Sequence, residues 1–289
     1  MNDLRLGMGR RAAALLTCVA LASMSGQAAL AQRRGNVPAP QLSGREASPI
    51  DITGDWVSLI TDDWVYRMIT PAKGDYSYVP LNAEGRRVAD TWDPAADAAA
   101  GEDCKAYAAP AIMRLPSRVH ISWQDDNTLE LDIDTGMQTR LFHFGQSEPQ
   151  GARSWQGWSH AEWQISGNID RQLVFGGART SLEEVPRNGS LKVDTSNLRA
   201  GYLRRNGVPY SEDAFMTEYY NLIVEDDGNQ YLVIQTFVED PQYLNSHFVR
   251  TLQFKREPDD SKRMPLDCEA ATKLSTTASG LPSPDGGRR

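Results

Sequence analysis

The feature that most constrains the fold is a succession of three strand-like runs between residues 215 and 255. Each run is rich in β-branched and aromatic residues, and short polar connections separate them: Phe215 to Val224, Gln230 to Val238 and His247 to Lys255. Asp227-Gly228 between the first two runs is a strong hairpin signal, because tight two-residue turns need positive φ at both central positions. The stretch therefore predicts an antiparallel β-meander.

A two-residue turn at Asp227-Gly228 also sets the register of this hairpin. It pairs Asp226 with Asn229 and places one set of side chains on a common face: Glu218, Tyr220, Leu222, Val224, Tyr231, Val233, Gln235 and Phe237. Both faces then mix apolar and polar residues, whereas a half-exposed sheet is apolar on one face only. The mixture favours a closed barrel with a polar-spotted interior, or a sheet covered on both sides.

A second meander is predicted over three runs: Arg118 to Trp123, Thr128 to Asp134 and Gln138 to Phe144. A three-residue turn that ends with Asn127 in the left-handed region sets apolar residues beside one another: Val119, Ile121, Trp123, Leu129, Leu131 and Ile133. A four-residue turn would set them against Glu130 and Asp132, so we reject it. A following turn at Thr135-Gly136 brings Phe142, Phe144 and Arg140 to the same face.

The early part of the chain adds two strands and a helix to this plan. Strands are expected over Ile52 to Ile60 and over Trp64 to Ile69. A long excursion from Pro71 to Pro116 follows, in which Asn82 can cap a short helix that ends near Trp92. The prediction is an all-β fold, an antiparallel β-barrel built from meanders, with one short helix in a long early loop.

Gly54-Asp55-Trp56 opens the first strand, and a Gly-x-Trp in that place resembles the lipocalin signature. The resemblance implies a lipocalin-like barrel in which Trp56 plugs the closed end. Five scattered stretches also resemble a family of secreted bacterial β-rich proteins whose function is not assigned: Gly54-Asp55-Trp56, Cys104-Lys105, Trp155 to Ser159, Gly207 to Ser211 and Glu239 to Tyr243. This second resemblance implies no catalytic residue.

The N-terminus has the form of a secretory signal. Arg5, Arg10 and Arg11 precede the apolar stretch from Ala12 to Met24, and Ala29-Leu30-Ala31 has the small-x-small form of a cleavage site. The apolar run is shorter than the roughly 20 residues that a bilayer-spanning helix needs. We therefore expect a periplasmic or secreted protein with four parts: a signal peptide (1–31), a flexible leader (32–49), a single barrel domain (50–270) and a disordered tail (271–289).

The charge of the chain limits which partners it can bind, and its cysteines indicate a disulfide. The chain has 38 acidic and 30 basic residues, which argues against binding to nucleic acid or to anionic membranes, since both depend on clustered Lys and Arg. Cys18 lies in the signal, so Cys104 and Cys268 form an even pair that we expect to be a disulfide in an oxidising compartment. Two thiolates without a histidine at ligand spacing are a poor zinc site, and no cofactor motif occurs.

A histidine-based active site is the first alternative to consider, from His120, His143, His160 and Glu162. In the preferred register His120 faces Asp132 on the outer side, as an exposed ion pair that contributes little. His160 and Glu162 share a strand face, but a stable metal site needs three or more protein ligands. The chain also contains no Gly-x-Ser-x-Gly elbow and no Gly-rich phosphate loop.

Polar residues on apolar strand faces are the better candidates, because buried charge is costly unless it is paired or used. They are Arg140, Glu218, Tyr220, Gln235 and Arg250, and the loop from Ser196 to Ala214 adds Arg204 and Tyr210 as a mouth. A purely structural role is the competing interpretation, for example Arg250 packed over Trp56.

Together these patterns predict a protein that binds a small apolar or amphipathic molecule in its interior. A cofactor-independent lyase, hydratase or isomerase is the alternative, since a positioned acid or base in an apolar cavity suffices for such chemistry. A structural envelope protein is the third possibility.

Overall fold

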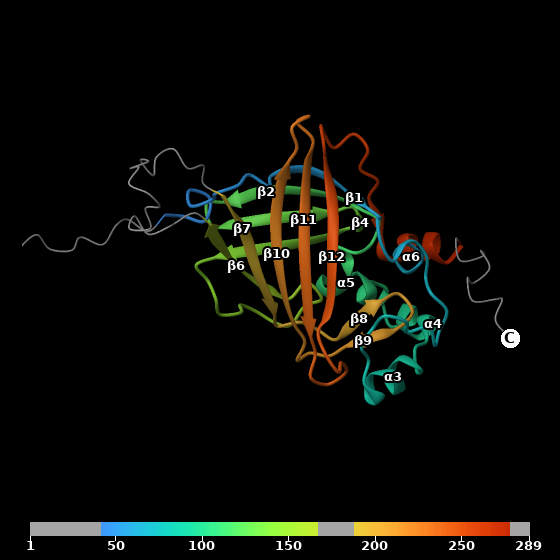
Figure 1. Cartoon of the computed structure of the whole chain (residues 1–289). Coiled ribbons are helices and arrows are strands. Elements are labelled where there is room, and N and C mark those ends of the chain that lie inside the picture. Colours follow the sequence, from blue (N-terminus) through green and yellow to red (C-terminus); the bar gives the residue numbers. More distant parts are fainter. Residues whose placement is uncertain (1–41, 167–187, 278–289) are drawn as a thin grey trace, which may run out of the picture. The chain divides into compact units, whose positions relative to one another are not determined.

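The computed structural model describes residues 42–166 and 188–277, and within them the chain forms a closed, nine-stranded β-barrel (Figure 1). Around the barrel the strands are β1 (Gly54–Leu59), β12 (Phe248–Glu257), β11 (Gln230–Glu239), β10 (Phe215–Val224), β7 (Asn188–Ser196), β6 (Trp158–Ser166), β5 (Gln138–Phe144), β3 (Thr128–Ile133) and β2 (Arg118–Asp125). Neighbours are antiparallel except β5 and β6, which are parallel. The expected barrel is confirmed, but the expectation of an all-antiparallel sheet is wrong at that pair.

The register predicted for the second meander is confirmed. Val119 pairs with Ile133 and Ile121 with Leu131, and all four side chains are buried. Across the next strand pair Arg140 lies opposite Leu131, so its side chain also points into the barrel. The connection differs from the expected one, because the ladder shifts between residues 123 and 125, as at a β-bulge, rather than turning through a left-handed residue 127.

The register predicted for the β10–β11 hairpin is wrong by one residue. Glu225 pairs with Asn229 across a three-residue loop in which Gly228 takes a left-handed φ of 82°. A type I turn closed by a left-handed glycine is the usual three-residue hairpin loop, and the side chain of Asp227 supports it by accepting from the Asn229 N–H. Glu218 therefore pairs with Thr236, and Gln235, predicted to point inward, is exposed.

Several short helices occupy the region where one was predicted. They are α2 (Trp64–Met68), α3 (Ala83–Ala89), α4 (Pro94–Ala99), the 3-10 helix η1 (Asp103–Tyr107) and α5 (Ala109–Ile112). The α3 helix is the predicted one, and its Asn82 cap accepts from the Gly85 N–H. The strand predicted over Trp64 to Ile69 is wrong, since that segment is α2 and turns Arg67 into the interior. Asp93 caps a further helix, α4, with Pro94 in its first turn.

Two apolar cores result from this arrangement. The first fills the barrel and includes Trp56, Ile121, Leu131, Phe142 and Phe254. The second covers the end of the barrel at which β12 begins: Tyr76, Val79, Leu81, Leu198, Leu203, Val208, Tyr210, Met216, Val238 and Phe248 are among its members. Its cover includes the hairpin of β8 (Gly201–Arg204) and β9 (Val208–Tyr210), which lies with α3, α4 and α5 beside the barrel in Figure 1. The segment expected to be a mouth loop is therefore largely buried.

Substitution of Gly207 by alanine should destabilise this cover. Gly207 has a φ of 80°, and a Cβ there would lie 2.2 Å from the Cβ of Trp92. Gly74→Ala is the matched control, because Gly74 has a φ of 90° but its added Cβ would meet no described atom within 4 Å. Thermal and urea unfolding should show Gly207→Ala to be less stable than the control by about 1–3 kcal/mol, the usual cost of overpacking. Equal losses of stability in the two variants would contradict this prediction and would mean that Trp92 moves aside at no cost.

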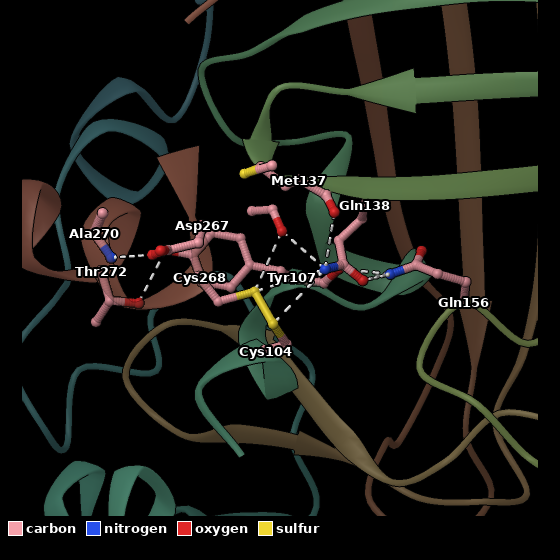
Figure 2. The surroundings of a disulfide bond; sticks show 10 residues. Cys104, Tyr107, Met137, Gln138, Gln156, Asp267, Cys268, Ala270 and Thr272 are labelled. Atoms are coloured by element: carbon pink, nitrogen blue, oxygen red, sulfur yellow. Dashed lines mark hydrogen bonds between the residues drawn. A yellow bond between two sulfur atoms is a disulfide. The ribbon is translucent and has the colours of Figure 1, made fainter. Parts of the chain in front are cut away.

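A disulfide joins Cys104 in η1 to Cys268, the first residue of α6 (Cys268–Thr277), as predicted (Figure 2). Next to it, β13 (Leu266–Asp267) pairs with β4 (Thr135–Gly136), and the hydroxyls of Tyr107 and Thr272 lie 3.0 Å apart. Residues 271–277 are thus helical where the sequence predicted the start of a tail.

The predicted N-terminal and C-terminal segments lie partly outside the described residues. The signal peptide over 1–31, the leader as far as residue 41 and the tail from 278 lie outside the described residues. The described end of the leader contacts the barrel, since the Gly44 N–H donates to Asn127 and the Gly44 carbonyl accepts from Trp163. Within residues 42–166 and 188–277, none of the helices is both long and apolar enough to cross a membrane.

Candidate functional site

Inside the barrel, Arg140 and Glu218 form a buried ion pair. The strand patterns predicted that both side chains point inward but did not pair them with each other. Arg140 Nη2 lies 2.6 Å from Glu218 Oε2 and Nη1 lies 3.2 Å from Oε1, and both side chains are fully buried. Tyr220 and Thr195 provide further contacts to the guanidinium. Burial, and then the Glu218 carboxylate, raise the pKa of the Tyr220 hydroxyl, which therefore stays neutral. The two charges satisfy each other, which is the geometry of a structural pair.

The other predicted site residues are spread over the molecule. Gln235 is on the outer surface, and Tyr210 is buried in the second core, where it pairs with Gly201 at the end of the β8–β9 hairpin away from its turn. Burial raises the pKa of Tyr210, and its hydroxyl has no hydrogen-bond partner among the described residues. Among these other residues, Arg204 and Arg250 are the two that the structure brings into one neighbourhood.

That neighbourhood is the barrel end at which β12 begins, and it holds a set of arginines from four distant parts of the chain. We call it the arginine cluster: Arg67 in α2, Arg114 after α5, Arg204 at the end of β8 and Arg250 in β12. Three of them are at most 5% exposed, and the side chain of Arg250 is 17% exposed. Arginines are rarely buried without a partner, so this concentration of positive charge points to a function.

Two acidic residues after β1 meet part of this charge. Asp63 Oδ2 lies 3.2 Å from Arg250 Nε and 3.3 Å from Arg114 Nη2. Asp62 pairs with Arg67 at 2.9 Å. The ring of Phe248 lies under the guanidinium groups of both Arg250 and Arg114, at 4.2 and 5.2 Å from its centroid. Charged groups and an aromatic surface therefore meet at the same point.

Arg204 is the member of the cluster whose guanidinium makes no hydrogen bond to another described residue. Its side chain stacks over the ring of Tyr66 at 4.3 Å, and the residue is 3% exposed. None of its three guanidinium nitrogens has a hydrogen-bond acceptor among the described residues. A buried charge that makes no hydrogen bond costs several kcal/mol, so a protein retains one where something uses it.

The arginines of the cluster lie close enough to lower one another's pKa values. Burial, and then the neighbouring charges of Arg204 and Arg250, lower the pKa of Arg114 to about 9. Burial followed by the charge of Arg250 also lowers the pKa of Arg204. Mutual repulsion among cations that are still protonated at neutral pH is relieved by an anion. The arrangement can therefore bind a carboxylate, phosphate or sulfate group.

A pocket of about 400 Å³ opens beside the cluster. Its lining is Tyr78, Val79, Pro80, Ser246, His247, Phe248, Val249 and Arg250. Arg250 is anchored there by donating to the carbonyl oxygens of Tyr78 and Val249, at 2.8 and 2.7 Å. Tyr78 and Asp63 both adopt left-handed backbone conformations, with φ of 63° and 47°. Such conformations cost free energy in residues other than glycine and are frequent at ligand sites.

The four histidines, all in the described part of the chain, are not part of a group that could hold a metal ion. His120 is indeed opposite Asp132 in the sheet, but its Nδ1 contacts Asp55 of β1 at 2.8 Å, so the predicted partner is wrong. His143 stacks on Trp158, with ring centroids 3.9 Å apart. Within the described ranges no group of three or more His, Cys, Asp or Glu side chains is placed to hold a metal ion.

Sequence reasoning missed Arg67, Arg114 and Asp63. Arg114 lies between Met113 and Leu115 in a run that is otherwise buried and apolar, and this was a usable signal of an inward arginine. Arg67 was hidden by the incorrect strand assignment, which gave its side chain the wrong direction. Asp63 has no local signal, because only the folded chain brings it between Arg114 and Arg250.

No known family model, curated protein or solved structure matches this chain. The arginine cluster and its pocket are therefore interpreted from their own chemistry.

Proposed function

We propose that the protein is an exported β-barrel that binds a small amphipathic molecule at the covered end of the barrel, with the anionic end of the ligand held by the arginine cluster. The observation that carries the proposal is Arg204, a buried guanidinium with no acceptor among the described residues. Guanidinium groups bind carboxylate and phosphate oxygens with two parallel hydrogen bonds. An anionic ligand would supply the hydrogen-bond acceptors that Arg204 lacks among the described residues.

The pocket supports an amphipathic rather than a purely polar ligand. Its wall combines Phe248, Val79 and the ring of Tyr78 with the guanidinium of Arg250. Its volume of about 400 Å³ is in the range of small-molecule sites. The apolar part of a ligand can lie against the aromatic rings while its charged end faces the arginines. These features favour binding at the covered end of the barrel over the interior binding that the sequence predicted.

Two further observations support an exported, lipocalin-like binder. The Cys104–Cys268 disulfide is typical of proteins in oxidising compartments. Trp56 is fully buried at the opposite end of β12, where its indole N–H donates to the Ile52 carbonyl and Arg256 lies 4.7 Å over its ring. In this arrangement Arg256 takes the position over the tryptophan that the sequence had suggested for Arg250.

Replacing Arg204 by methionine tests the proposal, because binding and stability should change in opposite directions. We expect octanoate to bind the unmodified protein, and Arg204→Met to weaken that binding by about tenfold or more, the value of a charge-assisted hydrogen bond. Stability should be unchanged or higher, since an apolar side chain of similar length replaces an unpaired buried charge. Isothermal titration calorimetry and thermal melting measure the two effects.

Arg199→Met is the matched control. Arg199 belongs to the same segment, but its side chain is 45% exposed and pairs with Glu102, so octanoate affinity should stay the same. Failure of octanoate and of benzoate to bind the unmodified protein would contradict the proposed function. An octanoate affinity of Arg204→Met equal to that of the unmodified protein would also contradict it.

A further inference from the structure

We propose that Asp63 is a specificity-determining residue that restricts the ligand to a single negative charge, so that the site takes monoanions such as carboxylates and rejects dianions such as phosphate monoesters. The inference rests on the proposed function, because it concerns the charge of the ligand bound at the arginine cluster. It goes beyond it by assigning a role to an acidic residue inside a cationic site.

The position of Asp63 is that of an internal anion. Its Oδ2 lies 3.2 Å from Arg250 and 3.3 Å from Arg114, so one carboxylate oxygen meets two guanidinium groups. Arg204, which is electrostatically coupled to Asp63 and Arg250, keeps its own hydrogen-bond donors unused. Asp63 thus fills part of the cationic site and leaves part of it for a ligand.

The balance of charge around the cluster favours one further negative charge. Three carboxylates of the described residues pair or interact with its four arginines: Asp62, Asp63 and Asp75. Asp62 pairs with Arg67, and Asp75 interacts with Arg204 and lies 3.5 Å from the Tyr66 hydroxyl. The set therefore carries one net positive charge. A monoanion neutralises it, whereas a dianion leaves excess negative charge in a largely buried place, where like charges repel strongly.

The start of α2 does not need the carboxylate of Asp63. Asp63 precedes α2 at its N-cap position, but its side chain accepts no capping hydrogen bond from the described helix. The hydrogen bond that starts the helix comes from its backbone, since the Arg67 N–H donates to the Asp63 carbonyl at 3.0 Å. Asparagine also adopts the left-handed region readily, so Asp63→Asn removes the charge and keeps the backbone.

Three octyl probes separate charge from shape at pH 8. Octanoate and octyl sulfate are monoanions, planar and tetrahedral respectively, while octyl phosphate is a dianion because its second pKa is near 6. For the unmodified protein we expect octanoate and octyl sulfate to bind with similar affinity and octyl phosphate about tenfold or more weakly. In Asp63→Asn the affinity for octyl phosphate should rise about tenfold relative to octanoate. Calorimetric titration measures all three ligands.

Asp62→Asn is the control, because that carboxylate is 49% exposed and solvent screens its charge, so the preference should change much less. Asp63→Gly is a second variant that also accepts a left-handed backbone, and it should reproduce the effect. Absence of binding by every probe overturns the proposed function. Three other results overturn this inference alone. The first is equal binding of octyl phosphate and octanoate, the second is octyl sulfate that binds like octyl phosphate, and the third is an Asp63→Asn effect that is equal for all three probes.

Discussion

Replacing Cys104 and Cys268 together by serine should lower the free energy of unfolding by about 5 kcal/mol. The two residues are 164 positions apart, and in the chain-entropy model the cross-link restricts the unfolded chain more as the loop it closes becomes longer. The folded contacts around the bridge, such as that between Tyr107 and Thr272, should survive the substitution (Figure 2). Urea unfolding of the two proteins measures the difference.

The unmodified protein unfolded in the presence of dithiothreitol is the control, and it should lose as much stability as the double serine variant. Non-reducing peptide mapping should find the Cys104 and Cys268 peptides linked. Freely alkylated thiols in the native protein, or a stability loss below about 1 kcal/mol, would contradict the expectation.

Glu218→Gln should destabilise the protein by about 3–5 kcal/mol, the usual cost of removing one partner of a buried ion pair. The change leaves the Arg140 guanidinium charged and fully enclosed, facing neutral groups such as Tyr220, Thr195 and the new amide rather than a carboxylate. Thermal melting and urea unfolding measure the loss. The octanoate affinity of the folded fraction should be unchanged, because the pair lies inside the barrel and the proposed site at its end.

Two comparisons make this prediction specific. The double variant Arg140→Met, Glu218→Leu should be more stable than Glu218→Gln, since apolar residues of similar volume replace a buried pair with little loss. His120→Ala should cost at most about 1 kcal/mol, because the His120 side chain is 39% exposed. A silent Glu218→Gln together with a damaging His120→Ala would contradict the inward placement of Glu218.

Most of the barrel strands and one of the two registers could be predicted from the sequence. Alternation between Val119 and Ile133 sufficed for β2 and β3, because only one pairing kept apolar residues together. The β10–β11 register failed because Asp227-Gly228 is compatible with a two-residue and a three-residue loop, and both faces of this hairpin are mixed. The aromatic and β-branched composition of Trp64 to Ile69 resembles a strand, but the left-handed Asp63 turns the chain into α2.

The candidate site was predictable only in part. Arg250 stood out as a charge on an apolar strand face and Arg204 as part of a predicted mouth loop. Arg140 and Glu218 were correctly directed inward. Which charges are paired could not be read from the sequence, because the partner of each arginine comes from a distant segment. Asp63 and Arg250, for example, meet only after the barrel has closed.

Closure of the barrel has a consequence for how fast the chain can fold. The strand β1 pairs with β2 on one side and with β12 on the other, and the second ladder joins residues 55–59 to residues 253–257. To form this ladder the chain must close a loop of about 200 residues, which costs entropy before the stabilising hydrogen bonds form. Folding rates fall as contacts become less local in sequence. Until β1 is inserted, β2 and β12 each present a free hydrogen-bonding edge, the feature through which incompletely folded sheets associate. We therefore expect insertion of the first strand to limit the refolding rate, and the yield to fall with increasing protein concentration.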